Sequence, residues 1–438
     1  MDLFSERTQF LGTESAFKIG EDIRRCEESG MMVVKLNLGE PDFSSPDNIN
    51  EVAVNEIRKG NTHYADPQGI ISLRERIANQ VSETRGIAVD PERVVVSTGA
   101  KSIISYTFLG YVNRGDEVIY PSPGYPIYES WVTFMEAKPV PLHLEESKRF
   151  RFGARDLEHL ITPKTKLIVI NSPSNPTGGV LTEDDLADIS RVVLTKSDGN
   201  MRVLSDEIYE DIVFDGRKHK SIASVPGMMD RTIVMSGHSK SYAMTGWRLG
   251  YAVMPTVEEA MLFRQFNINF ISCVSPFIQE AGRAAFENRE NREIVASMVS
   301  EFQKRRDFVV DSLNRIEGIH CVKPEGAFYV FPNIQEVCKK LGIIDAYETL
   351  PDETRKSTSP SSLFQMFLLY HHGVATMDRR SFGSIGSEGE HYIRLSTAAS
   401  MDVLKEGMRR IEKAAKDSEG FRGFFERGEH FYLGAGEH

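Results

Sequence analysis

Short apolar runs alternate with longer stretches in which apolar and polar residues recur at helical spacing. Runs that are apolar throughout are typical of strands buried on both faces of a largely parallel sheet, with helices as the connections. We therefore predict one large α/β domain over residues 51–300. The runs are RVVVS at 93–97, DEVIY at 116–120, KLIVIN at 166–171, MRVLSD at 201–206 and TIVMS at 232–236.

A second pattern begins near Arg289, where a long helical periodicity continues to about Ile316. Mixed strand and helix patterns follow, so we predict a small domain formed by residues 1–50 and 301–438. Residues 345–362 are rich in Ser, Thr and Pro, which predicts an exposed loop. The tail at 416–438 has no evident helical period, but its aromatic residues predict that it packs on the fold or on a partner.

The chain has 438 residues, of which 40% are hydrophobic, and a net charge of -11. An acidic chain lacks the basic surface that nucleic acids and anionic membranes require, so we expect a small-molecule substrate. The first residues lack a basic segment followed by an apolar run, and no span of about 20 apolar residues occurs. We therefore expect a cytoplasmic protein without a membrane segment.

The stretch SGHSKSYAMTGWRLGY at 236–251 carries the most specific chemistry. Its single lysine, Lys240, lies among small and hydroxyl residues, which suits an amine that must be unprotonated and fixed to attack a carbonyl. Arg248 follows eight positions later, and a guanidinium can bind a phosphate through two hydrogen bonds. A phosphorylated aldehyde cofactor would need both groups.

This stretch resembles the pyridoxal-phosphate attachment motif of the class I/II aminotransferases, of the aspartate aminotransferase-like fold type I. It departs from the family pattern at Gly237 and His238. The resemblance implies a mostly parallel central sheet flanked by helices, a second and smaller α+β domain, and pyridoxal 5'-phosphate (PLP) bound to Lys240. It covers nearly the whole chain to about residue 415.

Other segments match the family in the same order along the chain. The predicted strand RVVVS ends at Ser97, and Thr98, Gly99, Ala100 and Lys101 open a predicted helix whose backbone N–H groups can point at a phosphate. Ser239, next to the lysine, is assigned to the cofactor as well.

Two further segments match the part of the family site that binds the cofactor ring. In LSDEIYE, Asp206 ends a buried strand, and a buried carboxylate there can keep the pyridine nitrogen protonated. Tyr209, three positions on, and Asn175 in the NPTG turn can hydrogen-bond the phenolic oxygen. Tyr125 in PSPGYPIY resembles the residue that stacks on the ring, although a core aromatic is an equal alternative.

Tyr64 in THYADPQGI resembles the tyrosine that reaches the phosphate in the neighbouring subunit. The resemblance therefore implies a homodimer with shared active sites. For the substrate, Arg394 in EHYIRLSTA resembles the reader of the α-carboxylate, and Gly39 in LNLGEPDF resembles the loop that closes over the substrate. Tyr125 and Asn175 also belong to the implied substrate site.

The implied reaction is transamination between an L-amino acid and a 2-oxo acid, with Lys240 as both tether and base and with Asp206 and Tyr209 in support. The same residues also serve PLP-dependent lyases and a cyclising synthase of this fold, so those chemistries stay open. A non-catalytic ligand sensor is a third alternative.

Substrate choice is the least specified property. We favour aspartate or glutamate, since Arg379, Arg380 and Lys18 are cations that can read a second carboxylate. Solvated surface charges are the alternative explanation for all three.

Overall fold

The computed structural model describes residues 3–12, 15–197 and 199–428, with the backbone alone at 15–18. Its main element is a seven-stranded sheet in the order β2-β8-β7-β6-β5-β3-β4. Strand β8 is antiparallel to both neighbours and the other pairs are parallel. The strands are β2 (Val94–Thr98), β3 (Glu117–Ser122), β4 (Lys138–His143), β5 (Thr165–Asn171), β6 (Arg202–Asp206), β7 (Thr232–Gly237) and β8 (Leu249–Val253).

The sheet is buried on both faces, as its apolar runs predict. In β5, Leu167 and Val169 join one hydrophobic cluster, and Ile168 and Ile170 join another on the opposite face. The first cluster includes α4 (Ala100–Tyr111), α5 (Ile127–Phe134) and α8 (Val257–Phe270). The second includes α1 (Ser15–Glu28), α6 (Ala154–Glu158) and α7 (Glu183–Lys196), and a third packs α2 (Asp47–Arg58), α3 (Ile71–Arg85) and α9 (Pro276–Glu287) on β2 and β8.

The five predicted runs are β2, β3, β5, β6 and β7, which confirms the mostly parallel α/β sheet. Strands β4 and β8 did not stand out in the sequence. Strand β4 contains two prolines, which an edge strand tolerates because one side of it makes no ladder bonds.

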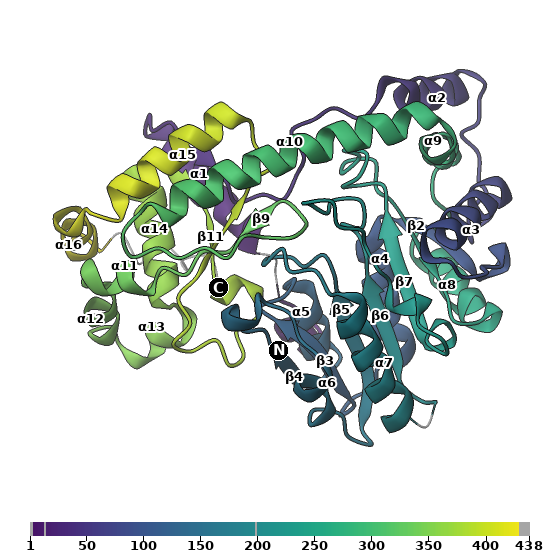
Figure 1. Ribbon diagram of the computed structural model, residues 1–438, viewed down its shortest axis with the longest axis horizontal. Helices are drawn as coiled ribbons and strands as arrows, with labels where there is room; N and C mark the ends of the chain where they lie inside the picture. The colour runs from purple at the N-terminus through teal and green to yellow at the C-terminus, as the bar shows by residue number, and fades with distance from the viewer. Residues whose placement is uncertain (1–2, 13–14, 198, 429–438) are drawn as a thin grey trace.

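Helix α10 (Arg289–Asn314) runs across the molecule from α9 to α15 (Met401–Ala414) (Figure 1). At its far end lie two small sheets, a parallel pair of β1 (Val34–Lys35) with β10 (Val374–Ala375), and an antiparallel set of β11 (Met377–Asp378), β12 (Ile393–Ser396) and β9 (Tyr329–Val330). The domain limits at residues 50 and 300 stay a prediction. Short 3₁₀ turns occupy Glu6–Phe10, Pro91–Arg93, Glu146–Lys148, Ile222–Ser224, Met229–Arg231 and Arg380–Phe382.

The predicted loop at 345–362 is wrong. The segment is helical, because its serines and prolines begin helices instead of interrupting them. Ser359 caps α14 by accepting a hydrogen bond from the Ser362 backbone N–H, and Pro360 takes the first helical position. The helices of this region are α11 (Gln335–Lys340), α12 (Ile343–Glu348), α13 (Asp352–Ser357) and α14 (Pro360–His372).

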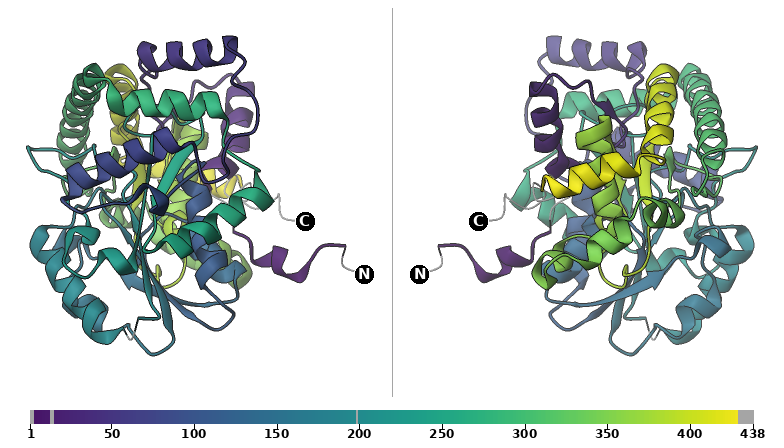
Figure 2. Two further views of the ribbon diagram at one scale, coloured as in Figure 1. Left: turned by 90° about the vertical axis from the view of Figure 1, so that its right-hand side faces the viewer. Right: turned by 90° about the vertical axis from the view of Figure 1, so that its left-hand side faces the viewer.

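The tail packs on the fold, as predicted for its first part, but as a helix that was not foreseen. Helix α16 (Ser418–Glu426) buries Phe421 and Phe424 against Phe367 of α14, with ring centres 5.6 and 5.7 Å apart. This helix is the yellow one at the front of the right-hand view in Figure 2. Residues 429–438 lie outside the described residues. Among the residues that are described, no helix is long and apolar enough to cross a membrane.

Candidate active site

A cavity of about 580 Å³ lies where the carboxyl ends of β5 and β6 meet the start of α4, and the loop at 38–40 and Arg394 of β12 complete its wall. Parallel strands bring the residues that follow them to one edge of the sheet, which is where ligands bind in such folds. Eleven of the sequence-predicted site residues line it: Gly39, Ala100, Lys101, Tyr125, Asn175, Asp206, Tyr209, Ser239, Lys240, Arg248 and Arg394.

The Lys240 ammonium connects segments that are far apart in the chain. Its Nζ donates a hydrogen bond of 2.6 Å to the Gly39 carbonyl oxygen. The same nitrogen lies 5.9 Å from the ring centre of Tyr209 and 5.7 Å from that of Phe328. The amine is thus held between aromatic rings at the cavity wall.

One end of the cavity is suited to an anion. Gly99 precedes α4 with a φ of 77°, and a Cβ added there would lie 2.3 Å from Nη2 of Arg248. Only glycine therefore lets this guanidinium approach the start of the helix. Arg248 also donates from Nη1 to the Thr245 carbonyl oxygen at 2.7 Å. Gly99 supports the cavity from behind and does not line it.

Asp206 lies at the end of β6 with its carboxylate buried. It accepts hydrogen bonds from the Tyr128 hydroxyl at 2.6 Å and from the Ile208 backbone N–H at 3.2 Å. Burial raises the pKa of Asp206 to about 6, and the bond from Tyr128 limits the rise. A cationic ligand group beside this carboxylate would restore its charge. Tyr128 was missed, although it lies three positions after Tyr125, one helical turn away on α5.

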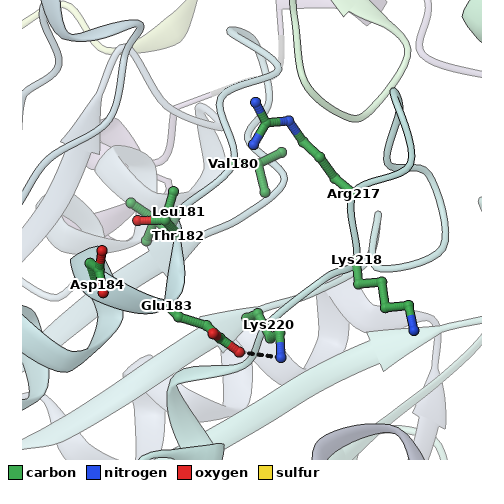
Figure 3. Close-up of a pocket in the computed structure, with 8 residues that line it drawn as sticks. All are labelled: Val180, Leu181, Thr182, Glu183, Asp184, Arg217, Lys218 and Lys220. Atoms are coloured by element: carbon green, nitrogen blue, oxygen red, sulfur yellow. Dashed lines mark ion pairs between the residues drawn. The ribbon is translucent and has the colours of Figure 1, made fainter.

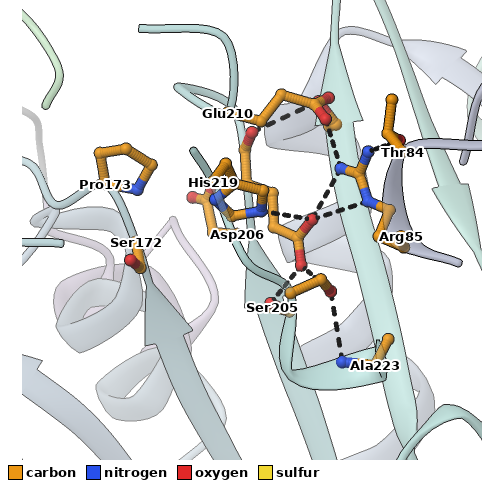
Figure 4. Close-up of polar contacts among 12 residues, drawn as sticks. Thr84, Arg85, Ser172, Pro173, Ser205, Asp206, Glu210, His219 and Ala223 are labelled. Atoms are coloured by element: carbon orange, nitrogen blue, oxygen red, sulfur yellow. Dashed lines mark hydrogen bonds and ion pairs between the residues drawn. The ribbon is translucent and has the colours of Figure 1, made fainter. Parts of the chain in front are cut away.

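The next residue in the chain, Glu207, faces a different environment. Its carboxylate accepts hydrogen bonds from Nε and Nη2 of Arg85 and from the hydroxyls of Ser205 and Ser221, and it pairs with His219 at 3.0 Å. Arg85, Ser205 and His219 of this network are labelled in Figure 4. Burial by itself would raise the pKa of Glu207, but the charge of Arg85 outweighs it and holds that pKa well below its usual range. Both carboxylate oxygens of Glu207 accept hydrogen bonds from the protein, and Glu207 does not line the cavity.

Arg394 is buried in the cavity wall, and two of its three guanidinium nitrogens donate hydrogen bonds. Its Nη1 donates to Asn175 Oδ1 at 3.0 Å, and its Nη2 donates to the Asn37 carbonyl oxygen. Nε has no hydrogen-bond partner among the residues described. The guanidinium lies 4.5 Å from the ring centre of Tyr329, whose hydroxyl is 2.8 Å from that of Tyr209.

Sequence reasoning missed several cavity-lining residues, among them Tyr329 and Asn171. Tyr329 lies among adjacent aromatics in the run AFYVF, which gave no signal of its own. Asn171 ends β5, and its Oδ1 accepts the Asn175 backbone N–H at 2.8 Å, so it orients that loop. A polar residue that ends an apolar run was the signal available for Asn171.

Tyr64 is not part of the cavity of the single chain. Its side chain is 89% exposed in the loop between α2 and α3. A side chain as exposed as this one is accessible to a neighbouring subunit.

The suggested readers of a second carboxylate are corrected by the structure. Arg379 is buried, and its donors reach Glu390 at 2.6 Å, the Gly383 carbonyl at 2.9 Å and Ser122 at 3.1 Å. Arg380 donates to the Lys356 carbonyl oxygen, and neither arginine lines the cavity. Arg379 is therefore a structural ion-pair residue, not a solvated charge. The Lys18 side chain lies outside the described residues.

Comparison with known proteins gives one consistent result. The family model for aminotransferase class I and II matches residues 31–411. The chain belongs to this family. It is an aminotransferase, and the family implies PLP as the cofactor.

The aminotransferase relatives differ in the substrates they are named for. An aromatic-amino-acid aminotransferase 2 of Thermococcus litoralis is 36% identical over 88% of this chain and 92% of its own. A probable aspartate/prephenate aminotransferase of Aquifex aeolicus is 34% identical over 94% of this chain and 98% of its own. The crystal structure of the Rhizobium meliloti aspartate aminotransferase has a TM-score of 0.85 at 33% identity, covering 95% of this chain and 99% of that chain.

The residues present fit the cofactor of the aminotransferases. Gly99 leaves room for the Arg248 guanidinium at the start of α4, and this arrangement suits a phosphate. The buried Asp206 carboxylate suits a protonated ring nitrogen. The departure at His238 is accommodated, since that ring is buried against Phe286 with centres 4.6 Å apart and its Nε2 lies 3.0 Å from the Gly282 carbonyl oxygen. Burial lowers the pKa of His238 to about 4, so it is neutral there.

A second cavity, of about 340 Å³, opens at the start of α7 and contains none of the predicted site residues (Figure 3). Its acidic and basic side chains partly neutralise one another, as in the ion pair of Lys220 with Glu183.

Proposed function

We propose that this aminotransferase transfers an amino group between an aspartate-type L-amino acid and a 2-oxo acid, with PLP bound covalently to Lys240. The observation that supports this most directly is one cavity lined by the Lys240 amine, the Asp206 carboxylate and the Arg394 guanidinium. An amine, a buried carboxylate and a guanidinium are the nucleophile, ring partner and carboxylate reader that the reaction requires.

When bound, PLP supplies an electron-accepting ring for the charge that develops at the substrate Cα. In our proposal Asp206 holds the ring nitrogen in its protonated form. Tyr209 and Asn175 donate to the phenolic oxygen, and Tyr125 stacks on the ring. The phosphate is held by Gly99, Ala100, Lys101, Ser239 and Arg248.

Substrate binding would change two contacts seen in the cavity. Nη1 of Arg394 donates to the neutral Asn175 side chain, and Nε has no hydrogen-bond partner among the described residues. A carboxylate accepts more strongly from a guanidinium than a neutral amide does, so the substrate carboxylate can replace Asn175. Lys240, released from the cofactor, is then the base that takes the proton from Cα. Gly39 accepts from the Lys240 amine through its carbonyl, and this contact can hold the lysine near the substrate.

The aspartate preference requires a cation for the second carboxylate. Within the described part of the chain, four cationic side chains line the cavity: Lys101, Lys240, Arg248 and Arg394. With Arg379 and Arg380 engaged elsewhere, we infer that Lys101 also reads this carboxylate. Its ammonium lies 5.8 Å from the ring centre of Tyr125, the residue that stacks on the cofactor ring in our proposal, and this proximity supports the assignment.

A homodimer with shared sites follows if Tyr64 reaches the phosphate of the partner subunit. The exposure of Tyr64 supports this part of the proposal. We expect the protein to act in the cytoplasm.

The test of the reaction uses Lys240→Ala beside the wild type, with aspartate and 2-oxoglutarate as substrates. We expect glutamate from the wild type and a loss of at least about 10⁴-fold in kcat in the variant, because tether and base are both removed. Borohydride should fix the cofactor on Lys240 in the wild type. Ammonia release without glutamate would favour a lyase, and no reaction at all would favour a ligand sensor.

Substrate choice is tested by Lys101→Met. We expect kcat/KM for aspartate to fall by about 10- to 100-fold, since a hydrogen bond to a charged group is lost, while phenylalanine is little affected. Arg380→Met is the matched control and should change neither value. An equal loss for both donors would show that Lys101 serves the cofactor alone.

A further inference from the structure

Two histidines at the end of α14 meet an aspartate at the start of α16, and none of the three lines the active-site cavity. His371 Nε2 lies 3.6 Å and His372 Nε2 lies 3.2 Å from Asp417 Oδ2. One ligand atom from each of the three residues can be chosen so that all lie within 4.8 Å of one another. The helix that carries this aspartate lies beyond residues 31–411, which the family model matches.

Asp417 has one oxygen already in use and one that faces the histidines. Its Oδ1 accepts the Gly420 backbone N–H at 2.9 Å and so caps α16. The cap fixes the carboxylate and directs Oδ2 to the imidazoles. The ligand atom is therefore positioned by the helix itself.

The histidine rings are positioned by packing. Phe367, one turn earlier on α14, stacks on His371 at 5.3 Å and meets the edge of His372 at 4.9 Å. The His372 side chain is only 4% exposed, and its buried Nε2 makes no hydrogen bond of acceptable geometry with any described residue. A buried ring nitrogen that lies 3.2 Å from a carboxylate oxygen without a hydrogen bond of acceptable geometry leaves both atoms open to a further ligand group.

A divalent cation satisfies these groups better than a proton does. In tetrahedral Zn²⁺ sites, bonds of about 2.0–2.1 Å place neighbouring ligand atoms about 3.3 Å apart. The two observed histidine–aspartate separations are already close to this value. Two imidazoles and a carboxylate are a ligand set that suits zinc, and the partial exposure of His371 leaves room for water as the fourth ligand.

We propose that His371, His372 and Asp417 bind one Zn²⁺ per chain and fasten α16 to α14. The ion would stabilise the packing of Phe421 and Phe424 on Phe367. It would have no part in the transamination, since none of its ligands lines the active-site cavity.

The experiment uses the full chain without a histidine tag, stripped of metal and titrated with Zn²⁺, and with Co²⁺ as a visible probe. We expect one equivalent bound, a tetrahedral cobalt spectrum and a rise in melting temperature with zinc. His371→Asn, at the exposed ligand, should weaken binding by at least about tenfold and abolish the rise. Asp417→Asn keeps a helix cap and should weaken binding as well, with kcat unchanged in both variants.

Two controls separate this site from other histidines. His159→Asn changes an exposed histidine that belongs to no group of three candidate ligands among the described residues, and this variant should bind zinc as the wild type does. The double substitution H430N and H438N removes the histidines of 429–438 and should also leave binding intact. The proposal is overturned if binding is absent, if it survives His371→Asn and Asp417→Asn, or if it is lost in the tail variant.

Discussion

The active-site cavity and the ion-pair network behind it contain neighbouring acids of opposite character. Asp206 faces the cavity with two neutral donors, and burial raises its pKa to about 6. Glu207 faces away, toward Arg85 and His219, and its pKa is held well below the usual range although it is as deeply buried. Burial alone therefore does not decide the state of a carboxylate. The presence of a fixed cation does.

The opposite pKa shifts of the two acids indicate different roles for the cavity and for the ion-pair network. In the network every strong acceptor of Glu207 has a donor from the protein, so the group stabilises the fold. Within the part of the chain that the structure describes, no cation is hydrogen-bonded to the Asp206 carboxylate and the Arg394 Nε has no hydrogen-bond partner, so both suit a ligand that brings the missing charge. The predictions below test this division.

The largest effect is expected for Glu207→Gln. Breaking this buried ion pair removes one carboxylate that compensates Arg85 while Glu210 still pairs with it, so we expect a cost of about 3 kcal/mol of unfolding free energy, the lower end for a broken buried pair. Chemical denaturation at pH 7 measures this loss. Because folding lowers the pKa of Glu207, its contribution is present above the unfolded value of about 4.3 and disappears as the pH falls below that value. A variant as stable as the wild type at pH 7 would refute the structural role.

Asp206→Asn should do the reverse, harming catalysis and not stability. We expect kcat to fall by about 10²–10³-fold, because the charge that stabilises the protonated ring is lost. Folding raises the pKa of this acid, so the apoprotein binds its proton more tightly than the unfolded chain, and wild-type stability falls as the pH rises from about 4 to about 6. At pH 7 the free energy of unfolding of the Asp206→Asn apoprotein should therefore exceed that of the wild-type apoprotein by up to about 3 kcal/mol. A clear loss of apoprotein stability there would contradict the comparison.

The smallest effect is expected for Ser221→Ala, which removes one donor from the network. The Ser221 hydroxyl donates to Glu207 and accepts the Ala223 backbone N–H, so its loss should cost about 1–3 kcal/mol. Thermal unfolding measures the change, and kcat should stay as in the wild type. Ser147→Ala is a matched exposed control, since its hydroxyl donates to Glu145 at the surface.

The sequence by itself determined the sheet and most of the candidate site. Apolar runs gave five strands, because residues buried on both faces of a sheet must all be apolar. The site residues follow strand ends, and the parallel order of β5 and β6 brings Asn175 and Asp206 to one edge without further information.

Only the tertiary structure decided which charges are engaged. In the sequence, Arg379 and Arg85 are indistinguishable from surface arginines. In the structure both are buried, Arg85 in an ion pair with Glu207 and Arg379 in an ion pair with Glu390. The helices at 343–372 and 418–426 were missed for two reasons. Serine, proline and aspartate begin most of them, and these residues are also typical of loops. The last helix is in addition stabilised by the contact of Phe421 and Phe424 with α14, which the sequence does not reveal. Local sequence encodes preferences of a few tenths to one kcal/mol per residue, whereas burial against a distant partner contributes several times more.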